Sequence, residues 1–185
     1  MHLSLIVTLC FSFIALSFQQ NSAPSLKDLL AKQTNLTSFS DFLTKSLPDL
    51  LSELEAQEAS GQPITILAPS NAAFNKIPYY SVIGPAWGSR NLDAQREIMK
   101  YHILPGDITT DVLLPTFQFF PTWLTNSTFA NVTDGQRVGA VMQGGKLLFF
   151  VSGISNRSPS TITDLKFAGG FVLLDACHCA HNAQT

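Results

Sequence analysis

The sequence predicts an α+β domain, because helical and extended hydrophobic patterns occupy different halves of the chain. In the first half, apolar residues recur at three- and four-residue spacing. From Phe129 onward, they occur in short runs with a period of two. The 185 residues are 45% hydrophobic and 13% charged. This is enough apolar material for one core and too little charge for a disordered chain.

The chain begins with a nearly unbroken apolar run of 16 residues, Leu3 to Phe18. A membrane-spanning helix needs about 20 apolar residues, and Ala15 and Ser17 are the small residues that a signal-peptide cleavage site requires. We interpret residues 1–17 as a secretory signal peptide, with an uncleaved anchor or a buried helix as the alternative. No second hydrophobic segment lies at the C-terminus, so no membrane span or lipid anchor is expected in the mature chain.

Three helices are expected before the first strand. The first covers residues 25–33, with Ser25 as its N-cap and three leucines on one face. A longer helical pattern over residues 42–54 follows, and Pro48 interrupts it. Because proline is tolerated in the first turn of a helix, we expect two packed segments, the second capped by Ser46.

The stretch ITILAPSNAAF predicts a strand, a tight turn and a short helix. Ile64 to Ala68 is a short β-rich run typical of a buried strand. Pro69 sets the direction of the turn, Ser70 is the expected N-cap of a helix that begins near Asn71, and Phe74 faces the core. A phosphate-binding loop or a nucleophile elbow would need glycines here. The sequence has none, which favours a packing role.

A helix and a set of strands are expected after this motif. Asn91 is the expected N-cap of a helix that carries Leu92, Ile98 and Met99 on its apolar positions. Gly144-Gly145 is expected to form a hairpin turn. The runs that predict strands are Phe129–Val132, Val138–Met142, Leu147–Val151, Ile162–Phe167 and Phe171–Leu174.

Two blocks of the sequence resemble the fasciclin (FAS1) domain family. The stretch ITILAPSNAAFNKI resembles the family's opening motif, an apolar strand followed by Ala-Pro, Ser or Thr, Asn or Asp, and Ala-Phe. Tyr101-His102 in IMKYHILPGDI matches the family's central Tyr-His pair. The resemblance covers Leu26 to Asp175. It implies a wedge-shaped β-sandwich flanked by N-terminal and central α-helices, within a domain over residues 25–176.

The last motif of the family is altered in this sequence. Similar domains have Asn-Gly, two apolar residues, His, and then Val-Ile-Asp. When Asp164-Leu165 is aligned with the family's Asp-Ile, Gly169-Gly170 stands in place of Asn-Gly and Leu173 in place of His. We therefore expect a divergent or shortened final strand. It would leave an unpaired sheet edge at Phe171 to Leu174, followed by a disordered tail over residues 177–185.

The resemblance also implies a function, namely a secreted, non-enzymatic module for cell adhesion or for interaction with an extracellular matrix or cell wall. Its partners would be cell-surface or matrix proteins or glycans, and no cofactor is expected. A net charge of −2 argues against nucleic acid as a partner. The expected location is extracellular, with the lumen of a secretory compartment or a vacuole as the alternative. A secreted hydrolase or small-ligand carrier on the same fold is the second hypothesis, although no Gly-x-Ser-x-Gly or His-Glu-x-x-His motif supports it.

Glycosylation is predicted from sequons behind the signal peptide. One sequon arises easily by chance, and four in a chain with a secretory leader are a stronger indication. The last of them is the weakest, because Pro159 directly follows its serine. The four acceptor residues are Asn35, Asn126, Asn131 and Asn156.

The remaining polar candidates each have a structural and a functional interpretation. His102 is expected to pack beside Tyr101 and bond to the backbone, since catalysis would need a partner that the sequence does not locate. Asp164-Leu165 matches the dipeptide position through which some family members are thought to engage integrins, and is equally an ordinary strand start. The cysteines and histidines of residues 177–181 are soft metal ligands. Their spacing and their place in a polar tail favour free thiols, so we expect no metal site.

Overall fold

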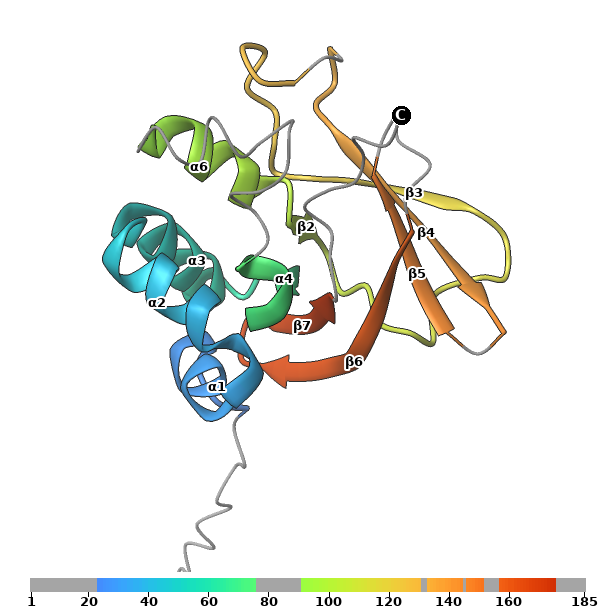
Figure 1. The fold of residues 1–185 in the computed structure, drawn as a ribbon, viewed down its shortest axis with the longest axis horizontal. Coiled ribbons are helices and arrows are strands. Elements are labelled where there is room, and N and C mark those ends of the chain that lie inside the picture. Colours follow the sequence, from blue (N-terminus) through green and yellow to red (C-terminus); the bar gives the residue numbers. More distant parts are fainter. Residues whose placement is uncertain (1–22, 76–90, 131–132, 145, 152–156, 176–185) are drawn as a thin grey trace, which may run out of the picture.

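The computed structural model describes residues 23–75, 91–130, 133–144, 146–151 and 157–175 (Figure 1). Several predictions from the sequence lie outside these residues. They are the signal peptide over residues 1–17, the tail over residues 177–185 with Cys177, His178, Cys179 and His181, and the sequon residues Asn131 and Asn156.

Helices form most of the described chain before residue 75, as the sequence predicts. Ser25 caps the first of them by accepting a hydrogen bond from the backbone N–H of Asp28. The predicted break at Pro48 is present. The helical elements are α1 (Leu26–Lys32), the 3₁₀ turn η1 (Thr34–Leu36), α2 (Thr37–Lys45), α3 (Pro48–Ser60), α4 (Asn71–Phe74) and α6 (Leu92–Lys100).

One detail of the helix predictions is wrong, and one apolar residue of α6 does not pack on the core. Ser46 ends α2 and does not cap α3, because Pro48 is the first residue of α3 and the capping position therefore falls on Leu47, which has no side-chain cap. Leu92 lies in α6, yet 54% of it is exposed and it belongs to neither core cluster. The later apolar positions of α6, Ile98 and Met99, pack on the larger cluster, and Ala94 is also buried.

The described strands form one open seven-stranded sheet in the order β2-β1-β7-β6-β5-β4-β3. All neighbours are antiparallel except β1 and β7, which are parallel. The strands are β1 (Ile64–Pro69), β2 (Ile103–Pro105), β3 (Gln118–Pro121), β4 (Arg137–Gln143), β5 (Lys146–Val151), β6 (Arg157–Phe167) and β7 (Gly170–Asp175). The predicted α+β class is confirmed.

The long strand β6 divides the sheet into two parts. Its beginning pairs with β5 and its end pairs with β7, and the register shifts twice between Ser160 and Leu165. Figure 1 shows β6 curving between the β3-β4-β5 ribbon on the right and the helix-covered part on the left. Bulges of this kind bend a strand and increase its twist, so the two parts of the sheet face different directions.

Two strand predictions need correction. Phe129 and Ala130 do not lie in a strand, because both donate backbone hydrogen bonds to the carbonyl of Asn126 and so form a turn. Conversely, β2 and β3 were not predicted. Both are very short, and a proline is the last residue of each, which leaves too few residues for a visible period of two.

Strand β1 lies between two hydrophobic clusters and is buried on both faces. Its residues Ile64, Ile66 and Ala68 join the larger cluster, which includes the buried leucines of α1, α2 and α3. Leu67 points the other way, into the smaller cluster with Val138 and Ala140 of β4. Successive side chains of a strand point to opposite faces. One face of β1 therefore packs on the helical layer and the other on the sheet.

Strand β7 is an interior strand, so the predicted unpaired edge at residues 171–174 is wrong. It pairs with β1 on one side and with β6 on the other. Gly170 has a φ of +144°, and a Cβ built there would lie 1.8 Å from the carbonyl oxygen of Ile64. The backbone N–H of Ile64 donates to the carbonyl of Gly169 at 2.9 Å. Gly170 therefore permits an approach of β7 to β1 that no other residue allows.

We predict that Gly170→Ala severely destabilises the domain, whereas Gly61→Ala does not. Gly61 also has a positive φ, of +69°, but a Cβ there would have no atom within 4 Å. Gly61→Ala should therefore lower the free energy of unfolding by about 1 kcal/mol, the backbone term alone. Gly170→Ala must also push β7 away from β1 and should cost at least about 3 kcal/mol. Urea unfolding of the two variants measures both, and equal losses would contradict this assignment.

Candidate functional site

The Ala-Pro-Ser-Asn motif connects β1 to the helical layer. Ser70 caps α4 by accepting a hydrogen bond from the N–H of Ala73 at 3.3 Å. The amide of Asn71 makes three bonds across the chain. Its Oδ1 accepts from the N–H of Ser38, and its Nδ2 donates to the carbonyl of Thr34 and to Oγ1 of Thr37, each at 2.9 Å. Asn71 therefore fixes α4 against η1 and α2.

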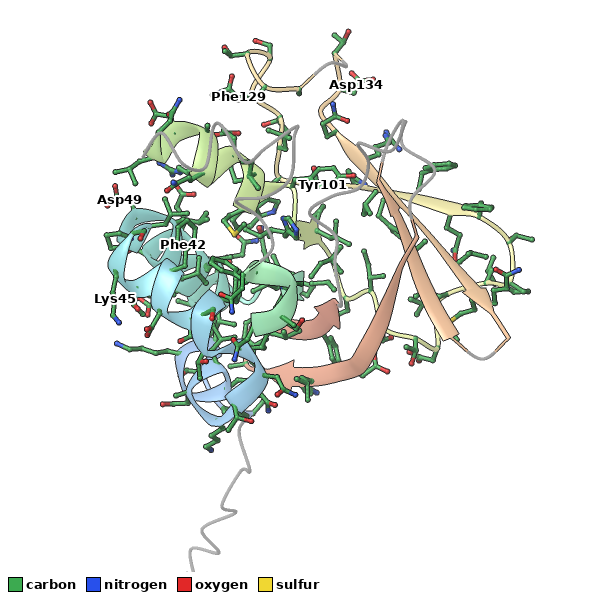
Figure 2. The ribbon with its side chains drawn as sticks, viewed as in Figure 1. Phe42, Lys45, Asp49, Tyr101, Phe129 and Asp134 are labelled. Atoms are coloured by element: carbon green, nitrogen blue, oxygen red, sulfur yellow. The ribbon has the colours of Figure 1, made fainter. Side chains whose placement is uncertain are left out.

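The other residues of this motif pack. Pro69 is buried at the end of β1, opposite Asp175 of β7. Phe74 is half-buried against the larger core cluster, and its ring meets that of Phe42 edge-on, with 5.3 Å between centroids and 60° between planes. Figure 2 labels Phe42 among the helices on the side of α2.

Tyr101 and His102 link the end of α6 to two strands. His102 is only 2% exposed, and its Nδ1 donates to the carbonyl of Ile98 at 2.8 Å. The carbonyl of His102 accepts from the N–H of Leu67 in β1, also at 2.8 Å. The Tyr101 ring contacts the His102 ring edge-on, and its hydroxyl donates to the carbonyl of Arg137 in β4 at 3.3 Å. Figure 2 shows Tyr101 between α6 and the β3-β4 ribbon.

Asp164 and Leu165 are engaged inside the chain. Asp164 has a φ of +59°, the one positive value among described residues other than glycine. Its Oδ1 accepts from the backbone N–H of Thr110 at 3.0 Å, and its Oδ2 accepts from the Thr110 hydroxyl. Leu165 is half-buried against the larger core cluster. The carboxylate thereby holds the bend of β6 against the segment after β2.

Reasoning from the sequence missed two residues that organise this region, Thr110 and Thr65. Thr110 and Asp164 are 54 positions apart and share no motif. Thr65 is fully buried in β1, where its hydroxyl donates to the carbonyl of Gly106 and accepts from the N–H of Ile108, both at 2.8 Å. A threonine inside an apolar strand is a usable signal, since a buried hydroxyl must find partners.

Two predicted glycosylation residues lie on the described surface. Asn35 is exposed in η1, and Asn126 is exposed in the turn after β3, where its Oδ1 accepts from the N–H of Thr128. The hydroxyl of Thr37, the third residue of the first sequon, also accepts the bond from Asn71. The first sequon thus shares an atom with the contacts of the Ala-Pro-Ser-Asn motif.

The described residues contain few features of a ligand site. An open hollow of about 410 Å³ lies beside α3, lined by Glu53, Ala56, Gln57, Ser60, Gln62 and Trp123. Within the described ranges there is no group of three or more His, Cys, Asp or Glu side chains placed to hold a metal ion. None of the helices described has the length and apolar character needed to cross a membrane.

Comparisons with known proteins agree with this fold. The sequence model of the Fasciclin domain family matches residues 34–164. A fasciclin-like arabinogalactan protein of Arthroderma benhamiae is 27% identical over 150 residues, which cover 81% of this chain and 34% of the relative. A solved FAS1 domain pair from the insect cell adhesion molecule fasciclin I matches with a TM-score of 0.57 at 18% identity, over 77% of this chain and 44% of that one. The chain thus spans about a third of the curated relative's length.

We predict that Asn71→Ala destabilises the domain by about 2 kcal/mol, because three hydrogen bonds between distant segments are lost, one of them partly buried. Asn71→Asp should cost at least as much, because it loses both donors and places a carboxylate oxygen against the carbonyl oxygen of Thr34, which repels it. Asn75→Ala is the matched control, because Asn75 is exposed at the end of the same helix. Thermal unfolding measures all three, and an unchanged Tm for Asn71→Ala would disprove the contribution of these bonds.

A second prediction separates backbone strain from hydrogen bonding at Asp164. Asp164→Ala loses both bonds to Thr110 and places a Cβ residue in the left-handed region, so it should cost about 3 kcal/mol. Asp164→Gly loses the same bonds without the strain and should be about 1 kcal/mol less destabilising. Asp164→Asn retains an acceptor and should be the mildest. If Ala and Gly unfold at the same urea concentration, the positive φ at position 164 adds no strain to the folded state of these variants.

Proposed function

The chain belongs to the fasciclin domain family, and from this premise we propose that it is a secreted, glycosylated and non-enzymatic adhesion module of an extracellular matrix or cell wall. The observation that carries the proposal is the family match over residues 34–164, which include the described helices α2, α3, α4 and α6 and strands β1 to β5. The fold neighbour in an insect cell adhesion molecule supports it at the level of architecture.

Cell-surface or matrix proteins or glycans are the proposed partners. One relative is described as a fasciclin-like arabinogalactan protein and the fold neighbour as a cell adhesion molecule. Because this chain spans only part of each, we transfer the role of the domain and not the partners of those whole proteins. The carboxylate of Asp164 is already bonded to Thr110, so we do not locate the partner surface there.

The geometry around the polar residues supports a non-enzymatic role. A general base must reach the proton that it removes, whereas the ring of His102 is buried and its Nδ1 is bonded to a backbone carbonyl. Asn71 and Asp164 likewise use their side chains to join segments of the chain. These polar groups stabilise the fold, which is the pattern expected when binding occurs over an outer surface.

Secretion and glycosylation are supported by the apolar leader and by the exposure of Asn35 and Asn126. We predict that protein recovered from the medium of expressing eukaryotic cells loses apparent mass on glycosidase treatment. Asn35→Gln and Asn126→Gln should each reduce the mass lost on glycosidase treatment by the mass of one glycan. Thr37→Ala is unsuitable as a test of the first sequon because it also removes a partner of Asn71. Exclusively cytosolic, unmodified protein would contradict the prediction.

The adhesion role is tested by binding. Fluorescently labelled secreted protein is applied to cell surfaces and to arrays of matrix proteins and glycans, with Gly170→Ala as the control for loss of fold. The expected result is saturable binding by the folded protein alone. The same preparation is screened against generic ester, peptide and glycoside substrates. If the purified protein hydrolyses one of these substrates and shows no saturable binding, the adhesion proposal is wrong and the hydrolase hypothesis takes its place.

A further inference from the structure

Strand β3 exposes the most prominent apolar surface in the described part of the chain. It is the last strand of the sheet, and of the described strands only β4 pairs with it. Phe119 is 63% exposed and Phe117 56%. Their rings stack with 6.5 Å between centroids. Leu114 and Val112, in the segment that leads into β3, are 54% and 48% exposed. We call these four side chains the β3 edge patch.

The sheet itself leaves Phe119 uncovered. Its cross-strand partner on β4 is Gly139, which has no side chain. The next residue, Phe120, points to the opposite face and packs on the smaller core cluster. Cross-strand neighbours normally shield an aromatic residue on a sheet, so the exposure of Phe119 follows from its partner being glycine.

Charged residues are missing from β3 and from the segments next to it in the sequence, although the exposed Arg137 of β4 pairs with Pro121 at the end of the strand. From Val112 to Thr133 the sequence contains no Asp, Glu, Lys, Arg or His. Sheet edges are normally protected against pairing by charges, especially lysine, or by proline and bulges. Here only Pro121 at the end of β3 has such an effect. An uncharged, aromatic edge is suited to an apolar occupant and offers nothing to attract a charged one.

The backbone N–H and C=O groups of Phe119 point away from β4, towards the open edge of the sheet. The N–H of Thr122 donates to the carbonyl of Gln136 at 3.0 Å, which continues the register of β3 with β4. In an antiparallel ladder, the N–H and C=O groups of successive residues point alternately to the two sides. Phe120 therefore directs its backbone groups towards β4, and Phe119 directs its N–H and C=O outward.

We propose that a second copy of this chain covers the β3 edge patch, by antiparallel pairing of β3 with β3 about a two-fold axis at Phe119. Antiparallel pairing of a strand with itself is self-complementary, which is the condition for a closed two-fold dimer. The outward N–H and C=O of Phe119 would bond to the same groups of the second copy. The stacked rings would meet across the axis, and the absence of charge removes repulsion between identical surfaces. This proposal does not depend on the proposed adhesion role.

The size of the patch predicts a weak dimer. An aromatic residue offers about 200 Å² of surface and Leu or Val somewhat less, so the four residues together expose about 400 Å² at the fractions given above. A stable interface buries about 800 Å² on each partner. The β3 edge patch supplies about half of that, so the dimer should form at high protein concentration and dissociate on dilution.

The first test is the oligomeric state of the secreted protein over a dilution series, measured by sedimentation velocity. Phe119→Lys should lower the association constant by roughly a hundredfold or more, because both copies lose a buried phenylalanine. Its Tm should be unchanged, since the side chain is exposed in the monomer. Leu92→Lys is the matched control, because Leu92 is 54% exposed on α6, away from the patch. This variant should dimerise like the unmodified protein.

The second test examines the register by cysteine cross-linking, in a Cys177→Ser, Cys179→Ser background. With the axis at Phe119, only that residue lies opposite itself, and Gln118 lies opposite position 120 of the second copy. At protein concentrations high enough to offset the lost phenylalanine, Phe119→Cys should therefore form a disulfide dimer under mild oxidation much faster than Gln118→Cys. A protein that stays monomeric at its highest soluble concentration overturns the proposal. So does a dimer that survives Phe119→Lys, or equal cross-linking by the two cysteine variants.

Discussion

The parallel contact between β1 and β7 is the constraint on which the rest of the domain depends. It exists because Gly170 lets the backbone of β7 approach that of β1, where a single methyl group at this position would overlap the carbonyl of Ile64. β1 in turn is buried on both faces and contributes to both hydrophobic clusters. The helical layer and the sheet are therefore held in one arrangement by the spacing of two strands, and neither layer is independent of the other.

The polar residues of the family motifs serve the same central strand. Thr65 bonds β1 to the segment after β2, the carbonyl of His102 bonds it to the end of α6, and Asn71 ties the helix that follows β1 to α2. Each of these contacts satisfies a group that burial would otherwise penalise. The polar residues of these motifs are thus explained by the contacts that hold the fold together.

Local signals in the sequence predicted local structure well. Ser25, Ser70 and Asn91 each cap the helix that they were expected to cap, because the bond joins neighbouring residues. Contacts between distant segments were not predictable in this way. The position of β7 inside the sheet depends on β1, and the bend of β6 depends on a threonine that no motif connects to Asp164. Short strands such as β3 were missed for a different reason, since four residues do not establish a period.

The central strand pair also determines when the domain can fold. Ile64 pairs with Gly170, roughly a hundred residues further along the chain, and contacts between such distant segments are slow to form. During synthesis, β1 leaves the ribosome long before its parallel neighbour does. For that interval, the helices have an incomplete surface to pack on, and an apolar strand lacks its partner. A chain with this topology needs protection during synthesis, so its yield of folded protein should depend on the chaperones of the compartment in which it is made.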